Sequence, residues 1–274
     1  MKSSSMPFAK MHASANDFVV IDNRSKVVSE KASSLAIRLC ERKTGIGADG
    51  MLLLENPSGI KADFRMRIFN PDGSEAEMCG NGARCIALFA FAKGVAPERM
   101  RIETKAKPVS AEIKGERVRL SLSSPKKPGM DFPVKVKGRN IKVSYINTGV
   151  PHTVIFVHGL KEVDVDGIGS AIRHHGKFAP AGTNVDFVSV EDERSVSIRT
   201  YERGVEGETL ACGTGSVASA IVAGIKGYVA PPVNVKTRGG EVLKVSYRIE
   251  KDGIKDVYLE GGAKIVYEGR IGRD

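Results

Sequence analysis

Two cysteines occur in the same local setting, each directly before a glycine-rich turn and an apolar segment. Cys79 lies in the run MCGNG and Cys212 in the run ACGTG. At a helix N-terminus the first peptide N–H groups have no internal partner and carry partial positive charge. A thiolate is stabilised there, so we expect a thiol in this setting to have a pKa below the ordinary value of about 8.5.

The same turns are suited to binding a carboxylate, because glycine lets the backbone approach an anion closely. If both turns open into one cleft, they hold a carboxylate from two sides and place a sulfur on each face of the adjacent carbon. One thiolate then removes the α-proton and the opposite thiol delivers a proton. Preorganised amides stabilise the developing charge, so inversion of an amino acid without any cofactor is predicted. The peptide groups expected to bind are those of Gly80, Asn81, Gly213 and Thr214.

The other two cysteines lie in less informative surroundings. Cys85 falls on a different face of the segment that follows Cys79, and Cys40 lies in an ordinary amphipathic stretch. No pair has the C-x₂-C spacing of a zinc site. Disulfides are not expected in a cytoplasmic chain of this length. We therefore expect both to be packing residues.

The two cysteine runs belong to an internal repeat. Lys93-Gly94 recurs as Lys226-Gly227, and Thr104 recurs as Thr237, at the offset that separates the two cysteines. Homologous halves predict two domains facing each other across a pseudo-twofold axis. The boundaries expected are residues 1–128 with Cys79 and 129–267 with Cys212, joined by a proline-rich linker at 123–138. Whether 268–274 completes the first half stays open.

The segments after the two cysteines, 81–93 and 214–226, are apolar on all sides. Arg84 is the only charge in their interiors, which indicates buried helices. Each ends with lysine and then glycine, as suits the helix dipole and a left-handed cap.

Strands with alternating apolar residues surround these helices in the sequence, at 64–68 and 196–200. Amphipathic helices are expected at 30–42 and 165–174, outside the sheets. The predicted fold class is α+β, with two pseudo-symmetric domains that each curl a β-sheet around a central buried helix.

Composition places the chain among ordinary globular proteins. Its 274 residues are 41% hydrophobic and 27% charged. No apolar run approaches the length of a membrane-spanning helix, and the first ten residues lack the apolar core of a secretory signal. The net charge of +10 raises the question of nucleic acid, but basic residues alternate with acids and no basic run has stacking aromatics. We expect a cytoplasmic protein that binds neither nucleic acid nor membrane.

Eight segments carry a resemblance to a known family. In its motifs the chain resembles the diaminopimelate epimerase family, within the broader superfamily of proline racemases and phenazine-biosynthesis isomerases. The segments run in the family's order: NDFVVID (16–22), TGIGADG (44–50), FNPDGS (69–74), MCGNGAR (78–84), GVPH (149–152), TNVDF (183–187), YERG (201–204) and ETLACGTG (208–215).

The resemblance implies a cofactor-free epimerase of LL- and meso-diaminopimelate, acting in lysine and peptidoglycan precursor biosynthesis. It implies that Cys79 and Cys212 are the acid/base residues, and that His152 and Glu202 assist the thiols as bases. The far end of this substrate carries an ammonium and a carboxylate, which amides, an acid and an arginine suit. The implied substrate-binding residues are Asn16, Asn70, Gly80, Asn81, Asn184, Glu202, Arg203, Gly213 and Thr214.

Three positions depart from the family pattern, and we expect them to remove auxiliary contacts: Ala15, Gly50 and Val150. Two other functions stay open. A proline or hydroxyproline racemase of the same superfamily is disfavoured by Asn81 and by the Tyr-Glu-Arg run. A non-catalytic binding protein would require both repeated cysteines to be inert. Assembly also stays open, and a homodimer is one possibility.

Overall fold

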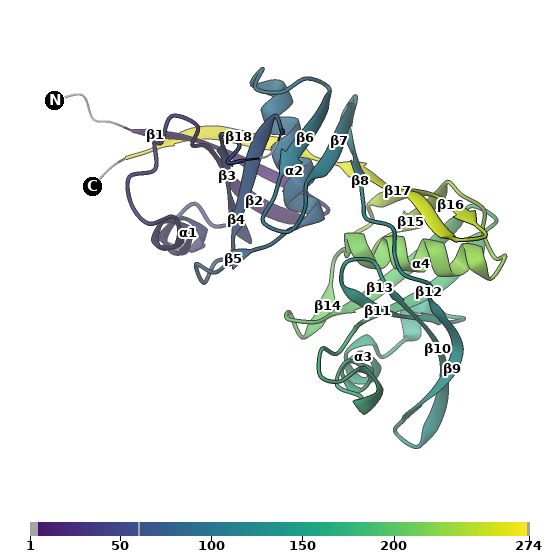
Figure 1. The fold of residues 1–274 in the computed structure, drawn as a ribbon. Helices are drawn as coiled ribbons and strands as arrows, with labels where there is room; N and C mark the ends of the chain where they lie inside the picture. Colours follow the sequence, from purple (N-terminus) through teal and green to yellow (C-terminus); the bar gives the residue numbers. More distant parts are fainter. Residues whose placement is uncertain (1–4, 60, 273–274) are drawn as a thin grey trace. The chain divides into compact units, whose positions relative to one another are not determined.

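A computed structural model describes residues 5–59 and 61–272. Contacts within the chain group it into two units. The N-terminal unit comprises the chain up to Leu120 together with the segment from Gly261 onward, and the C-terminal unit runs from Ser121 to Glu260. Both units combine a sheet with helices (Figure 1), so the predicted α+β class is confirmed.

The N-terminal unit contains one sheet whose strands pair in the order β18-β1-β2-β3-β4-β6-β7-β8, with β5 also on β4. The β2–β3 and β4–β6 pairs are parallel and the others antiparallel. The bounds are β1 (Met6–Ala13), β2 (Asn16–Asp22), β3 (Gly50–Glu55), β4 (Phe64–Phe69), β5 (Glu75–Ala76), β6 (Arg99–Glu103), β7 (Val109–Lys114), β8 (Arg117–Ser121) and β18 (Lys264–Ile271).

The C-terminal unit repeats this arrangement. Its strands pair in the order β9-β10-β11-β12-β13-β15-β16-β17, with β14 on β13, and the parallel pairs β11–β12 and β13–β15 stand at the matching places. The internal repeat in the sequence is therefore a repeat of topology. The bounds are β9 (Gly129–Val136), β10 (Arg139–Asn147), β11 (Pro151–Phe156), β12 (Asn184–Asp192), β13 (Ser195–Glu202), β14 (Gly207–Thr209), β15 (Val233–Lys236), β16 (Val242–Glu250) and β17 (Gly253–Gly262).

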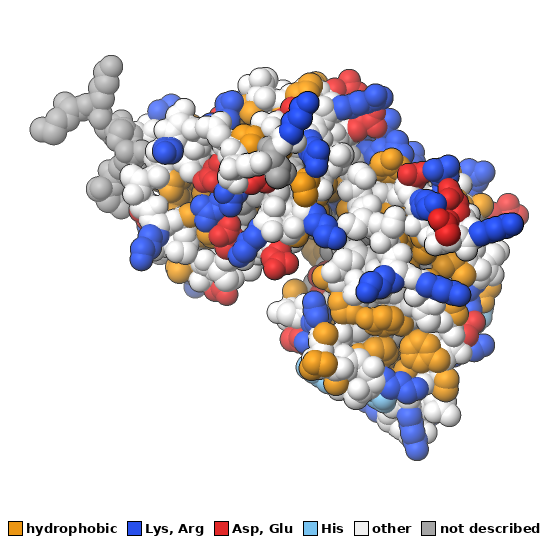
Figure 2. Space-filling view, viewed as in Figure 1, with side chains coloured by type: hydrophobic (Ala, Val, Ile, Leu, Met, Phe, Trp, Pro, Cys, Tyr) orange, Lys and Arg blue, Asp and Glu red, His pale blue; other side chains and the backbone are white. Residues whose placement is uncertain are grey.

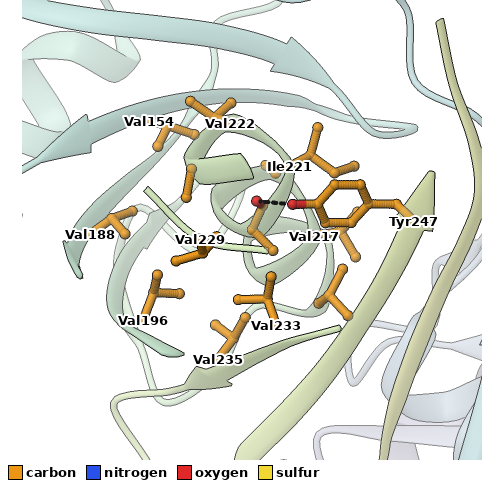
Figure 3. Close-up of a cluster of buried hydrophobic side chains, with 14 of the residues drawn as sticks. Val154, Val188, Val196, Val217, Ile221, Val222, Val229, Val233, Val235 and Tyr247 are labelled. Atoms are coloured by element: carbon orange, nitrogen blue, oxygen red, sulfur yellow. Dashed lines mark hydrogen bonds between the residues drawn. The ribbon is translucent and has the colours of Figure 1, made fainter. Parts of the chain in front are cut away.

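A buried helix lies at the centre of each unit. Helix α2 (Gly80–Ala92) packs against β1, β2, β3, β4, β7 and β18, and α4 (Gly213–Ile225) packs against β10, β11, β12, β13, β15 and β16. The core around α4 is formed largely by valine and isoleucine side chains (Figure 3). The glycines after each helix, Gly94 and Gly227, adopt φ of 65° and 73°. The predicted buried helices with left-handed caps are thus confirmed.

Two amphipathic helices cover the opposite sides of the sheets. Helix α1 (Ala32–Cys40) buries Leu35 and Leu39 against β3 and β4. Helix α3 (Val165–Arg173) buries its Val165 and Ile172 side chains against β12 and β13. Short 3₁₀ turns flank α3 at Leu160–Glu162 and Gly176–Phe178. The outer helices were expected at these positions.

The prediction of a linker throughout 123–138 was wrong, because its second half forms β9. This strand pairs with β10 and buries Val134 and Val136 in the core beside α3. Proline and lysine dominated the composition of the segment, but its apolar residues alternate as a half-buried strand requires. Pro133 is accommodated within the strand.

Charged side chains of both signs are interspersed over the face shown in Figure 2. Glu112 illustrates this mixture, since Arg99 and Lys114 both form ion pairs with it. Within residues 5–59 and 61–272, no helix has the length and apolar character needed to cross a membrane.

Candidate active site

Both repeated cysteines are N-caps of the central helices. Cys79 precedes α2 with φ −144° and ψ 124°, and Cys212 precedes α4 with φ −121° and ψ 111°. The amide of Gly82 donates to the Cys79 sulfur at 3.5 Å, and the amide of Gly215 donates to the Cys212 sulfur at 3.4 Å. The two units therefore place a thiol on the first turn of a helix in the same way.

Cys212 differs from the expectation for a thiol at a helix N-terminus. Burial raises its pKa well above the ordinary value, and the carboxylates of Glu202 and Asp186 raise it further. The amide of Gly215 opposes this shift but does not overcome it. The prediction of a lowered pKa was wrong for Cys212, because desolvation outweighs the helix dipole. At neutral pH the side chain is a thiol.

Glu202 is the last residue of β13, and its carboxyl group is buried. Burial raises its pKa, although the Thr209 hydroxyl donates to its Oε1 atom at 2.5 Å. Thr209 reaches it from β14, the strand paired with β13. A buried carboxyl group with a raised pKa exchanges its proton nearer neutrality than an exposed one, which suits it to acid/base work.

His152 lies at the centre of a buried hydrogen-bond network. Its Nδ1 atom is 2.7 Å from Asp186 Oδ2, and both side chains have 0% exposure. Its Nε2 atom is 3.0 Å from the Thr214 hydroxyl on the first turn of α4. That hydroxyl is also 3.5 Å from the sulfur of Cys212. A continuous chain of polar atoms thus connects Asp186 to Cys212.

The network also includes Asn184, which faces His152 across the parallel strands β11 and β12. Its Oδ1 atom accepts from the Arg203 amide at 2.8 Å, and its Nδ2 atom donates to the Pro151 carbonyl at 3.2 Å. The Arg203 guanidinium donates to the Ala181 carbonyl at 3.0 Å. The C-terminal unit therefore links four of its sequence-predicted residues to one another and to Cys212: His152, Asn184, Glu202 and Thr214. Arg203 joins them through its backbone amide, and Gly213 is the residue next to Cys212 in the chain.

In the N-terminal unit a buried arginine organises the residues around Cys79. The Arg84 guanidinium on α2 donates to Asn81 Oδ1 and to Ser14 Oγ, both at 2.6 Å. Ser14 belongs to the turn between β1 and β2, two residues before Asn16. The Oδ1 atom of Asn16 is buried and has no hydrogen-bond partner among the described residues. An unsatisfied buried acceptor of this kind is suited to a ligand that donates a hydrogen bond.

Asn70 directly follows β4. Its side-chain amide donates to the Ser74 hydroxyl at 2.9 Å within an exposed turn. Two of the family departures lie at positions where the backbone or its neighbours restrict the side chain. Ala15, where the family commonly has glycine, adopts φ of 60° in the turn before β2. A Cβ atom at Gly50 would lie 2.9 Å from the Phe69 carbonyl oxygen, so a larger side chain requires the strand to shift.

In the C-terminal unit, three side chains of the site received no role from the sequence. Asp186, Thr200 and Thr209 hold His152 and Glu202 in place, and Thr200 donates to Asp186 Oδ1 at 2.8 Å. Asp186 has one signal in the sequence, a charge between the apolar residues Val185 and Phe187, whereas Thr200 and Thr209 lie on strands with other polar residues and have none. Across the described ranges, no group of three or more His, Cys, Asp or Glu side chains is arranged to hold a metal ion.

Comparisons with known proteins agree over nearly the whole chain. A family model described as diaminopimelate epimerase matches residues 8–127 and 144–266. Proteins named diaminopimelate epimerase from Aquifex aeolicus and Hydrogenobaculum sp. are each 43% identical to this chain. The first alignment covers 98% of this chain and 99% of its relative, and the second covers 97% and 98%.

Solved structures with the same fold are more distant in sequence. A phenazine biosynthesis protein of the PhzF family from Bacillus anthracis has a TM-score of 0.73 at 17% identity, covering 99% of both chains. A hydroxyproline epimerase from Agrobacterium vitis, solved with trans-4-hydroxy-L-proline, has a TM-score of 0.71 at 15% identity. The match covers 100% of this chain and 94% of that one. At this identity the likeness concerns the fold alone.

Proposed function

The chain belongs to the diaminopimelate epimerase family, and from this premise we propose that it interconverts LL- and meso-diaminopimelate. As an amino-acid epimerase it is an isomerase. The observation that carries the proposal is the duplicated N-cap, in which Cys79 and Cys212 each accept an amide of their own helix through sulfur. The reaction belongs to the lysine and peptidoglycan precursor pathway.

The proposed chemistry transfers protons on opposite faces of the α-carbon. A thiolate on one side removes the α-proton while the thiol on the other side gives its proton to the opposite face. The raised pKa of Cys212 makes it a proton donor at rest. In the reverse direction Cys212 must lose its proton, and Glu202 and His152 are the buried bases beside it.

The helix turns are proposed to hold the reacting carboxylate. Amides at the start of α2 and α4 favour an anion, and they stabilise the charge that gathers on the carboxylate as the α-proton leaves. This electrostatic effect replaces an electron-accepting cofactor. The mechanism requires both sulfurs to reach opposite faces of one carbon atom. The amides concerned are those of Gly80, Asn81, Gly213 and Thr214.

The remaining polar groups are proposed to recognise the far end of the substrate. The unsatisfied Oδ1 atom of Asn16 is an acceptor for an ammonium group. The guanidinium of Arg203 is a donor suited to a carboxylate. Asn70, Asn184 and Glu202 complete the proposed set. A substrate with a second ammonium and carboxylate uses all of these groups, whereas proline has neither at a distal position.

Turnover of purified, reduced protein tests the proposal. We expect LL-diaminopimelate to be epimerised and proline to be left unchanged. Cys79→Ala and Cys212→Ala should each lower the rate by at least about 10⁴-fold, since each removes one of two essential proton carriers. Cys40→Ala is the matched control, because it removes a buried thiol whose pKa burial raises to about 11 and which lies on α1. Proline racemisation, or full activity in either variant of the repeated cysteines, would contradict the proposal.

A further inference from the structure

The directions of the hydrogen bonds around His152 follow from groups that have only one possible role. The backbone amide of Arg203 can only donate, so the atom of Asn184 that it contacts at 2.8 Å is the carbonyl oxygen Oδ1. The carbonyl of Pro151 can only accept, so the atom of Asn184 that faces it at 3.2 Å is the amide nitrogen Nδ2. Both partners give the side-chain amide of Asn184 the same orientation.

This orientation determines which nitrogen of His152 carries its proton. The amide Nδ2 of Asn184 lies 3.4 Å from His152 Nε2 and has a second hydrogen to donate. Nε2 therefore accepts, and the proton of the neutral ring lies on Nδ1. Nδ1 faces Asp186 Oδ2 at 2.7 Å, so the Asp186 carboxylate accepts that proton. Both ends of the imidazole select the same tautomer.

The same reasoning extends to Thr214 and Cys212. Because Nε2 is an acceptor with a single lone pair, the Thr214 hydroxyl at 3.0 Å donates to it and shares that lone pair with the more distant Asn184 amide at 3.4 Å. The remaining lone pairs of Thr214 Oγ1 face the Cys212 sulfur at 3.5 Å and accept its S–H. Each hydrogen bond then donates in the same direction: Cys212 to Thr214, Thr214 to His152, and His152 to Asp186. Glu202 also forms a hydrogen bond with the Cys212 side chain, so it is a second base that competes with Thr214 for the same S–H proton.

We propose that Asp186 is a positioning residue that directs a proton relay from Cys212 through Thr214 to His152. This inference rests on the proposed epimerase function. In the relay the Cys212 S–H bond breaks as its proton bonds to Thr214 Oγ1. The original hydroxyl proton of Thr214 moves to His152 Nε2. The products are a thiolate and an imidazolium, whose charge is balanced by the Asp186 carboxylate.

Asp186 is itself held firmly in this role. The Thr200 hydroxyl donates to its Oδ1 atom at 2.8 Å, which leaves Oδ2 for His152. Gly215 on the first turn of α4 gives the carboxylate room, since a Cβ atom there would lie within 2.3 Å of Oδ1. Two strands and the helix therefore determine the position of the carboxylate before any substrate binds.

The tautomer is tested on the protein without substrate, using long-range ¹H–¹⁵N NMR of histidine-labelled protein. We expect His152, assigned by its loss in His152→Gln, to be protonated at Nδ1. Asp186→Asn should move the proton to Nε2, since the new amide donates toward Nδ1. Asp192→Asn, an exposed carboxylate on the same strand, is the matched control and should leave the tautomer unchanged. An Nε2-protonated ring in the unmodified protein would overturn the inference.

Kinetics test the relay separately. Thr214→Val preserves the backbone amide and removes only the hydroxyl, so we expect kcat to fall by about 10²-fold or more with KM changed less than about threefold. An unchanged kcat would leave Glu202 as the sufficient base and overturn the relay. Thr200→Val, which frees the carboxylate without removing it, should lower kcat less than Asp186→Asn. If the unmodified protein epimerises no diaminopimelate, the proposed function fails, whereas the tautomer result stands by its own measurement.

Discussion

Alanine at Gly215 and at Gly82 should have very different effects, although the two glycines occupy equivalent positions in the repeats. A Cβ atom at Gly215 would lie 2.3 Å from Asp186 Oδ1, within a carboxylate that Thr200 and His152 both bind. At Gly82 the nearest atom is the end of the Leu52 side chain, at 3.1 Å, which can rotate away. The first substitution therefore displaces a buried charge and the second displaces a methyl group.

The expected changes in the free energy of unfolding follow from typical contributions measured in other proteins. Replacing glycine by alanine in a helix gains about 1 kcal/mol at either site. At Gly215 overpacking costs about 1–3 kcal/mol, and the displaced carboxylate leaves buried donors that cost about 1–3 kcal/mol each. We expect Gly215→Ala to lower the free energy of unfolding by about 2–8 kcal/mol, counting both donors, and Gly82→Ala to change it by less than about 1 kcal/mol.

Urea denaturation followed by far-UV circular dichroism measures both variants. The unfolding midpoint of Gly215→Ala should fall clearly below that of Gly82→Ala, with similar slopes for the two transitions. Equal losses in the two variants, or a greater loss for Gly82→Ala, would refute the packing of Asp186 against the first turn of α4.

Three further outcomes are expected. Because burial raises the pKa of Cys212, its alkylation by iodoacetamide at pH 7 should be slower than that of free cysteine and should accelerate above pH 9; rapid labelling of this residue by mass spectrometry would contradict this. The raised pKa of Glu202 means that the folded state holds this proton more tightly than the unfolded state, so its stabilising contribution is complete at low pH and is lost as pH rises through the folded value. Glu202→Gln should therefore gain stability relative to the unmodified protein as urea titrations move upward from about pH 4.3, and a pH-independent difference would count against the assignment. Asn16→Ala removes an unsatisfied acceptor, so KM for diaminopimelate should rise by about 10–100-fold, and an unchanged KM would remove Asn16 from the substrate site.

The central helices and their caps could be predicted because their information is local. An apolar segment bounded by Cys-Gly at one end and Lys-Gly at the other specifies a buried helix and both of its ends. In the same way, the alternation of apolar and polar residues predicts strands β4 and β13. Composition misled only at 129–136, where lysine and proline obscured the alternating residues of β9.

The electrostatics of the site could not be predicted, because they depend on contacts between strands. The helix N-terminus next to Cys212 is visible in the sequence, whereas the burial of Glu202 and Asp186 beside it follows only from the pairing of β12 with β13. For the same reason His152 could be assigned a role by resemblance, but its partners Asp186 and Thr214 could not be identified. Residues that act on the thiols through a second group leave little trace in a motif.

The most direct test of the two-thiol mechanism is the position of deuterium during the first turnovers in D₂O. Starting from LL-diaminopimelate, the protein should form meso-diaminopimelate that carries deuterium at the inverted α-carbon, while the remaining LL-diaminopimelate keeps its hydrogen. This result follows because one group removes the original proton and a different, solvent-exchanged group supplies the new one. Early meso product that retains the substrate's own hydrogen would show one group acting on both faces, and would contradict the account.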